Sequence, residues 1–277
     1  MALPFFNAYR GSIGRFFQGD PTLKGYWQLD GNSLDNSGNG NNGTNTNVIY
    51  GPGSVGNQNV ICWNGRPNTQ NYTTLPQIFP AGSTQITMMA WTNPLTPGYF
   101  GSWGGGKGTQ GAGQNAIIAT STSDQKSGFC IFHGCDTSTP SYQMCFSGFV
   151  RTTGGKVHIA TPKIFPCGNW YFVALTANTS TGDFRLYVNG VLQAQGSIAT
   201  GTFGGTNGAI GGLPGNPSPW YYYANALIAE GAMFNRVLSP AEISQYYQWA
   251  ISQPRKTYYE VGGLLVPNTR RRLLLTR

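Results

Sequence analysis

Acidic residues are scarce in this sequence of 277 residues. Asp and Glu together number nine, and only Glu230, Glu242 and Glu260 are glutamates. Hydrolysis of a glycosidic bond on a β-sandwich takes two carboxylates that face each other across a groove. No glutamate has an aspartate near it at such a spacing, and Glu242 occupies the position of a helix cap. We therefore expect no enzymatic activity and no catalytic residue.

Histidine is scarcer still, with only His133 and His158. A zinc site takes four ligands at tight spacing, and His133 between Cys130 and Cys135 does not form a known zinc framework. We interpret His133 as a structural residue with satisfied hydrogen bonds. The glycine-rich segment 104–108 has no strand leading directly into it and no capped helix after it, as a phosphate loop requires. The sequence thus indicates no metal ion and no cofactor.

Long apolar runs are also missing. No run approaches the roughly 20 residues that a membrane-spanning helix needs, so we expect no membrane insertion. The first ten residues lack the basic start and long apolar stretch of a signal peptide, so we do not expect export by that route. Five cysteines, an odd number, leave at least one free thiol in a monomer. The cysteine count is compatible with both an oxidising and a reducing compartment.

Glycine, proline and aromatic residues are abundant instead. The 40 Gly and 17 Pro occur with 13% aromatic residues, a combination that favours a turn-dense β fold over disorder. The net charge of +8 is concentrated at the ends of the chain. Residues 254–277 hold six basic residues against Glu260, whereas residues 25–253 hold eight basic and seven acidic residues. We therefore expect a nearly neutral body with basic ends.

The clearest local prediction is an antiparallel hairpin. Trp170–Ala177 is rich in aromatic and β-branched residues and predicts a buried strand. In the following strand, Phe184–Val188, apolar side chains alternate between two faces. Asn189-Gly190 then tolerates the positive φ angles of a type I′ turn, and Val191–Gln195 returns as the second arm.

Further segments predict strands, one polar loop and one helix. Asn32–Asn47 is rich in residues that tolerate left-handed backbone and predicts the loop. Ser239 as N-cap, Pro240 in the first turn and Glu242 as the third residue of a capping box predict a short helix that ends before Pro254. The remaining strands are predicted at Tyr26–Leu29, Val60–Trp63, Tyr72–Leu75, Gln85–Trp91, Ala116–Thr120 and Asn225–Phe234.

A second hairpin is predicted from Gly128–Gly134 and Tyr142–Val150. If the two arms are symmetric about their loop, Cys130 lies directly opposite Cys145. Directly opposed Cβ atoms on antiparallel strands lie within the range that a disulfide bridges. We therefore state a Cys130–Cys145 disulfide as a hypothesis.

Three blocks resemble a known family. Gly25–Thr44, Gly168–Ala174 with Phe184–Leu192, and Leu227–Ile243 resemble the opening, the central hairpin and the closing strand and helix of laminin-G-like domains, which belong to the concanavalin A-like lectin/glucanase superfamily. The resemblance implies an all-β, two-sheet antiparallel jelly roll with one short C-terminal helix. It also implies binding of glycans or proteins, often with calcium. Ala229-Glu230 stands where the family usually has Asp-Glu, so we expect no calcium site here. The Glu-x-Asp-x-x-Glu motif of the glucanase branch is absent from the sequence.

Aromatic residues in loops are the candidate ligand-binding residues. Such side chains stack on sugars or dock on proteins; the alternative is that they cover the open ends of the sandwich as part of its core. The candidates for glycan binding are Tyr99, Trp103, Trp220, Tyr221 and Tyr222.

Both ends of the chain lie outside the resemblance. We divide the chain into an N-terminal docking arm (1–24), a jelly-roll domain (25–253) and a basic C-terminal arm (254–277). An arginine cluster followed by Leu273–Leu275 suits insertion between acidic and apolar surfaces of a partner, and a laminin-G-like body with such a tail resembles domains attached to phage structural proteins. The candidate assembly residues are Phe5, Phe6, Phe16, Phe17, Arg270, Arg271 and Arg272.

Three functions stay open. The first is a non-catalytic structural protein that displays the jelly roll and binds other subunits of a shell, tail or filament, most specifically a phage virion surface, decoration or fibre component. The second is a carbohydrate-binding adhesin or filament subunit at the cell surface or outside the cell. The third is an unusual glycosidase that would use Asp183 and Glu230. The neutral body and the absence of a nucleic-acid motif lead us to expect no nucleic-acid partner.

Overall fold

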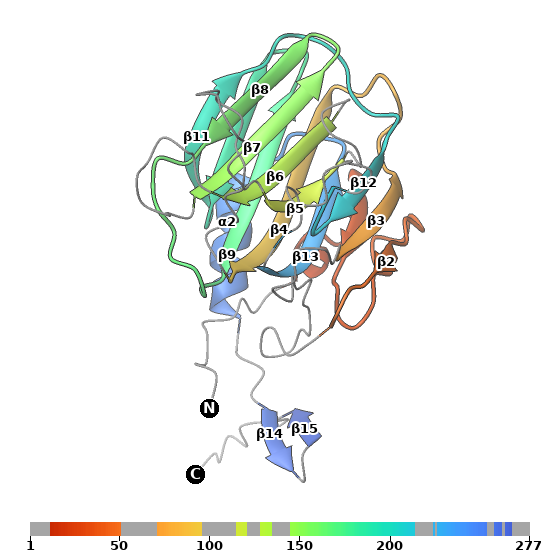
Figure 1. The fold of residues 1–277 in the computed structure, drawn as a ribbon, viewed down its shortest axis with the longest axis vertical. Helices are drawn as coiled ribbons and strands as arrows, with labels where there is room; N and C mark the ends of the chain where they lie inside the picture. Colours follow the sequence, from red (N-terminus) through yellow and green to blue (C-terminus); the bar gives the residue numbers. More distant parts are fainter. Residues whose placement is uncertain are drawn as a thin grey trace, which may run out of the picture.

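The computed structural model describes residues 12–50, 71–95, 115–120, 128–134, 145–213, 224, 226–253, 258–261 and 264–267. Within these ranges the protein is nearly all β, with two stacked sheets and two helices (Figure 1). All strand pairs are antiparallel. The predicted two-sheet antiparallel sandwich is thereby confirmed.

The two sheets contain six and seven strands. In spatial order the first comprises β1 (Leu23–Trp27), β13 (Ala226–Phe234), β4 (Gln85–Pro94), β9 (Tyr171–Asn178), β10 (Asp183–Val188) and β11 (Val191–Ser197). The second comprises β2 (Thr44–Thr46), β3 (Tyr72–Gln77), β12 (Asn207–Ile210), β5 (Asn115–Ala119), β6 (Gly128–Gly134), β7 (Cys145–Thr152) and β8 (Gly155–Ala160). A separate two-stranded sheet consists of β14 (Tyr258–Val261) and β15 (Leu264–Pro267).

The main core lies between the two large sheets. Alternation along the strands decides which side chains enter it: on β10, Phe184, Leu186 and Val188 belong to this core, whereas Tyr187 belongs to a second apolar cluster on the outer face of the six-stranded sheet. Burial of a Leu or Phe side chain stabilises the fold by roughly 1.5–3 kcal/mol. The alternation predicted for this strand is confirmed.

The predicted Asn-Gly hairpin is also confirmed. Asn189 and Gly190 have φ angles of 53° and 77°, as a type I′ turn requires. A Cβ atom on Gly190 would lie 3.0 Å from the Cβ atom of Tyr247 in the C-terminal helix. Glycine is therefore needed here for its backbone conformation and also for the close approach of the helix.

Two helices cover the outer face of the six-stranded sheet. They are α1 (Ile13–Phe16) and α2 (Pro240–Ser252), and α2 begins with the predicted capping box of Ser239 and Glu242. The centroid of the Phe16 ring lies 5.5 Å from that of Tyr246 in α2, and the centroid of the Phe17 ring lies 5.0 Å from that of Phe234. Phe16 and Phe17 therefore dock on the body of the same chain.

The register predicted for the β6–β7 hairpin is wrong. Cys130 lies opposite Phe149 and Cys145 opposite Gly134, so the two cysteines do not face each other and no disulfide joins them. The real register differs from the predicted one by four residues. Because side chains alternate with a period of two, an even shift leaves every inward-facing residue inward. Hydrophobic alternation therefore could not distinguish the two registers.

Several elements were not predicted, namely α1, β2, β8, β12 and the β14–β15 hairpin. Strand β1 begins at Leu23, two residues inside the segment expected to be an arm, and ends at Trp27, before Leu29, which has a φ angle of 60°. The strand predicted at 60–63 lies outside the described residues. The proposed division into arms and domain stays a prediction.

Candidate functional site

Three loops leave the sandwich at one end. The segment 95–114 follows β4, and the segment 211–225 precedes β13; Pro94 and Ala226, at these strand ends, are paired with each other. The segment 135–144 joins β6 to β7, where Gly134 is paired with Cys145. Tyr171 is paired with Thr92 near the end of β4, and its ring contacts Phe146 near the start of β7, so these strand ends of the two sheets lie close together.

The predicted glycan-binding residues belong to two of these loops. Tyr99 and Trp103 follow β4, and Trp220, Tyr221 and Tyr222 precede β13, all outside the described residues. Their role in ligand binding stays a prediction. The paired ends of β4 and β13 bring the attachment points of both groups together.

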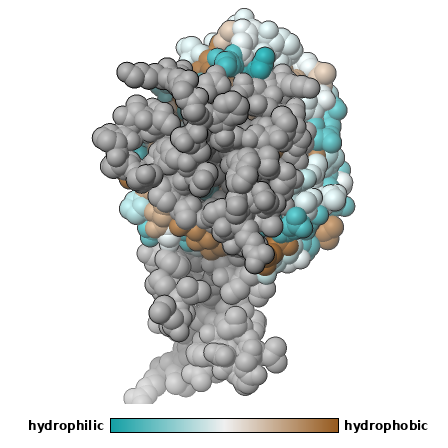
Figure 2. Space-filling model, viewed as in Figure 1, coloured by the Kyte–Doolittle hydropathy of each residue, from teal (hydrophilic) through white to brown (hydrophobic). Residues whose placement is uncertain are grey.

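Described side chains at the same end include both aromatic and exposed aliphatic residues. The Phe146, Phe165 and Tyr171 rings contact one another with centroid distances of 5.1–5.5 Å. The exposed fractions of Leu95 and Ile164 are 41% and 52%. The Gly168 N–H group donates a 2.7 Å hydrogen bond to the Pro94 carbonyl and so ties the loop between the two sheets to the end of β4. Figure 2 shows apolar surface along the lower part of the body. Such surface suits contact with a sugar or a protein.

His133 lies beside this aromatic group, fully buried and directly opposite Phe146. Contrary to the prediction of satisfied hydrogen bonds, neither ring nitrogen has a hydrogen-bond partner among the described residues, and neither does the Oγ1 atom of Thr92. Burial lowers the pKa of His133 to about 3, because the charged imidazolium would lose its hydration. The residue is therefore neutral at pH 7 and structural in character.

Glu230 is the most deeply buried carboxylate of those that the structure describes, with no exposed surface. It lies at a β-bulge of β13, with a φ angle of 58°, and accepts hydrogen bonds from the Tyr26 hydroxyl (2.6 Å) and the Ile13 N–H group (2.8 Å). Burial and the Glu230 charge raise the pKa of Tyr26. Glu230 thus fastens α1 to the sheet and does not line a groove. A Glu within an otherwise apolar strand was the sequence signal for a buried polar contact.

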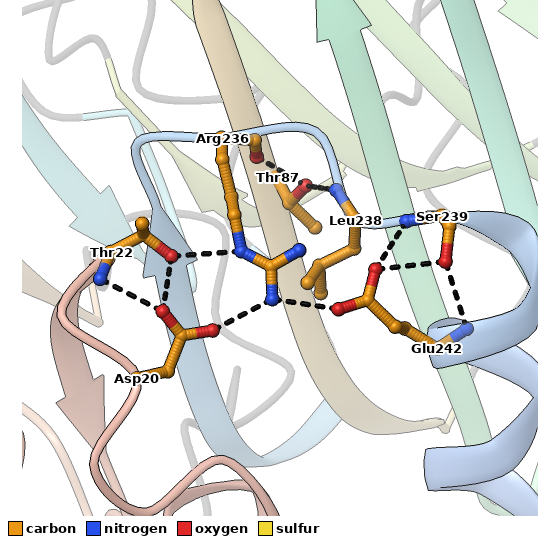
Figure 3. A network of polar contacts seen from close by, with 7 residues as sticks. All are labelled: Asp20, Thr22, Thr87, Arg236, Leu238, Ser239 and Glu242. Carbon is orange, nitrogen blue, oxygen red and sulfur yellow. Dashed lines mark hydrogen bonds and ion pairs between the residues drawn. The ribbon is translucent and has the colours of Figure 1, made fainter.

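Asp20 and Glu242 lie on either side of Arg236 (Figure 3). The Arg236 guanidinium donates a 2.7 Å hydrogen bond to each carboxylate, and it also contacts Thr22 at 3.0 Å. Burial alone would raise the pKa of Asp20, but hydrogen bonds from Thr22 and Arg236 outweigh it and hold this pKa below its usual value. The hydrogen bond from Arg236 similarly lowers the pKa of Glu242. This network joins the segment before β1 to the start of α2.

The remaining described aspartates include two with clear structural contacts. Asp183 forms a half-exposed ion pair with Arg185 at 3.0 Å. Asp35 accepts backbone hydrogen bonds from Tyr26, Ser37 and Asn41 and so fixes the polar loop onto β1. Neither geometry leaves a carboxylate aimed at a second one across a groove.

The described part of the chain contains no group of three or more His, Cys, Asp and Glu side chains that would hold a metal ion. Glu230, at the position where the family usually has Asp-Glu, is held by Tyr26 and Ile13 instead. Burial raises the pKa of the Cys130 thiol, which makes it a poor ligand or nucleophile at neutral pH. Among the described helices, none is long and apolar enough to cross a membrane.

A family model described as "Concanavalin A-like lectin/glucanases superfamily" matches residues 67–244, and no curated protein sequence matches the chain significantly. Domain 4 of AbnA, a GH43 extracellular arabinanase from Geobacillus stearothermophilus solved in complex with arabinotriose, is similar in structure. Its TM-score is 0.57 and its identity 17%, over 82% of this chain and 98% of that one.

Two toxin domains are also similar. The binding domain of Paraclostridial Mosquitocidal Protein 1 has a TM-score of 0.59 and 15% identity, over 82% of this chain and 52% of that one. The ligand binding domain of botulinum neurotoxin serotype D, in complex with N-acetylneuraminic acid, has a TM-score of 0.56 and 13% identity, over 86% of this chain and 52% of that one. Our chain thus matches about half the length of each toxin chain. At these identities the likeness concerns the fold.

The family match covers more than half of the chain, and the two antiparallel sheets agree with it. The central hairpin and the capped closing helix, which carried the resemblance in the sequence, are both present. This chain belongs to the concanavalin A-like lectin/glucanase superfamily and carries its laminin-G-like domain.

Proposed function

We propose that this chain is a non-catalytic carbohydrate-binding module that larger assemblies display through its terminal segments. The non-catalytic part of the proposal is supported by the hydrogen bonds and ion pairs that hold the described carboxylates. Glu230 is buried against Tyr26, and Glu242 and Asp20 are paired with Arg236. Carboxylates held in this way are unavailable as the facing acid and base that glycoside hydrolysis requires.

Sugar binding is favoured by the family and by two structural neighbours with sugars in their printed descriptions, arabinotriose and N-acetylneuraminic acid. The rim of loops between paired strand ends carries five candidate aromatic residues. We propose that this rim takes the sugar. The test is a glycan screen of the full-length chain beside a variant that combines Trp103→Ala and Trp220→Ala. Glycan binding that the double substitution leaves unchanged would contradict the placement at the rim, and no binding to any glycan would contradict the function.

The assembly part of the proposal is supported by the β14–β15 hairpin, which forms a sheet of its own. A two-stranded hairpin is marginally stable by itself in water, so contact with another subunit would stabilise it. The most specific form of this proposal is a phage virion surface, decoration or fibre component. The alternative is an adhesin or filament subunit at a cell surface.

Electron microscopy and sedimentation test the assembly role. The full chain is compared with a chain that ends at Gln253, which keeps α2 complete. Removal of residues 1–24 is a poor comparison, because it would also remove the partner that Ile13 provides for the buried Glu230. Assembly by the full chain alone supports the proposal; identical monomers of both forms contradict it.

A further inference from the structure

Charged residues are unequally distributed between the two large sheets. The ion pairs among the described residues, Arg185–Asp183, Arg236–Asp20 and Arg236–Glu242, all belong to the six-stranded sheet and its flanking segments. The strands of the seven-stranded sheet contain no Asp or Glu, but they contain Arg151 on β7 and Lys156 on β8. The seven-stranded sheet is therefore positively charged in its strands.

Arg151 and Lys156 are a directly opposed cross-strand pair. Like charges in this arrangement are destabilising. Within the described residues, neither has a carboxylate within ion-pair distance to offset the repulsion. Strand β8 lies at the edge of its sheet, and Lys156 is exposed. Figure 2 shows hydrophilic surface at the upper end of the molecule, where β7 ends and β8 begins in Figure 1.

An aromatic ring lies next to this basic pair on the same face. Phe149 precedes Arg151 by two residues and pairs with the exposed His158. Gly148 and Val150, which alternate with Phe149 and Arg151 along β7, face the core, so Phe149 and Arg151 face outward. Phe149 is half-buried, because one side of it packs on the apolar cluster that contains Cys130 and Phe132. Its position is therefore fixed before any ligand arrives.

We propose that the outward surface of β7 and β8, formed by Phe149, Arg151, Lys156 and His158, binds an anionic saccharide, one whose sugar carries a carboxylate or sulfate group. Guanidinium groups bind such groups in a bidentate manner, and lysine adds a compact positive charge. The Phe149 ring supplies an apolar face for the C–H groups of the sugar. Two strand positions span about 6.7 Å, so the ring and the Arg151 guanidinium contact neighbouring parts of one sugar unit.

This surface is a second saccharide site beyond the proposed rim, because Arg151 lies at the end of β7 whereas the segment 135–144 joins its start. The inference rests on the proposed glycan-binding function for its class of ligand. A saccharide is favoured over a nucleic acid because the surface presents one aromatic ring and one opposed basic pair, while residues 25–253 are nearly neutral overall. Nucleic-acid binding depends on many phosphate contacts along a basic groove.

The experiment is isothermal titration calorimetry of the full-length chain with four probes. These are galacturonic acid oligomers, heparin oligosaccharides, neutral dextran oligosaccharides and a single-stranded oligonucleotide. The variants are Arg151→Gln, Lys156→Gln and their combination. Lys163→Gln is the matched control, because Lys163 is an exposed lysine that follows β8 and lies outside the proposed surface. Thermal unfolding verifies that each variant is folded.

We expect at least one acidic saccharide to bind, and more weakly at higher salt. The double substitution should weaken this binding about tenfold or more, through loss of two charge-assisted contacts, whereas Lys163→Gln should leave it nearly unchanged. Binding of neutral dextran alone overturns the anionic ligand but leaves the glycan-binding function standing. Failure of every saccharide contradicts both. Acidic binding that the double variant retains, or tighter binding of the oligonucleotide, overturns this surface as a saccharide site.

Discussion

Stability between pH 8 and pH 5 should depend on His133. The imidazole is fully buried and has no hydrogen-bond partner within the described ranges, and burial lowers its pKa to about 3 from the usual value of 6.5. In the unfolded chain the same group takes up a proton near pH 6.5. The unfolded state therefore binds more protons at mildly acidic pH. His133 consequently contributes stability above pH 6.5, and this contribution is lost as pH falls toward 3.

The size of the effect follows from the unfolded pKa. At pH 5 that pKa lies about 1.5 units above the solution pH, and each unit corresponds to about 1.36 kcal/mol. The free energy of unfolding should therefore be about 2 kcal/mol lower at pH 5 than at pH 8. This difference in unfolding free energy depends little on the pKa of His133 in the folded protein, as long as that pKa stays well below 5.

The substitution His133→Leu should remove this slope. Replacing a buried, unpartnered polar group by an apolar one of similar volume costs little stability and can increase it. Urea unfolding at pH 8, 7, 6 and 5 measures the effect. The control is His158→Gln, which removes the chain's other histidine from an exposed position and should keep the wild-type slope. An unchanged slope in His133→Leu, or a slope abolished by His158→Gln, would refute the reasoning.

Three further predictions concern stability and are measured by chemical and thermal unfolding. Arg236→Gln removes contacts to two carboxylates and should cost about 2 kcal/mol, whereas Arg185→Gln breaks one half-exposed pair and should cost less than about 0.5 kcal/mol; equal losses would show that the two carboxylate contacts of Arg236 stabilise no more than the single one of Arg185. Tyr26→Phe removes a donor from the buried Glu230 and should cost about 1–3 kcal/mol; a neutral result would show that the hydroxyl is dispensable. Gly148→Ala would place a Cβ atom 2.6 Å from a side-chain carbon of the facing sheet and should cost about 1–3 kcal/mol; full stability would show that the core yields there.

Local sequence signals were sufficient for the elements that depend on near neighbours. Asn189-Gly190 has the backbone freedom that the turn needs, and Ser239 with Glu242 satisfies the first N–H groups of α2. Both predictions are confirmed because the interacting groups lie within three residues of one another. Strand β12 escaped prediction because its short sequence, Asn207–Ile210, resembles a loop outside the context of the sheet. In β8, Val157 and Ile159 alternate with polar residues, a strand signal that our prediction from the sequence missed.

Contacts between distant segments could not be inferred in this way. The Ile13 N–H group and Glu230 are 217 residues apart, and Arg236 and Asp20 are 216 apart. Glu230 stands in an otherwise apolar strand, a signal that our prediction from the sequence did not use, and its partners come from α1 and β1. The basic surface of β7 and β8 likewise depends on which residues pair across the strands.

The sequence by itself determined the fold class, the central hairpin and the capped helix, because hydrophobic alternation, turn chemistry and capping act over a few residues. Only the tertiary structure decided the register that separates Cys130 from Cys145, because an even shift preserves the alternation. It also decided that Glu230 fastens α1 and that Arg151 faces Lys156. These contacts form only when strands from distant parts of the chain pair and the sheets close on their core.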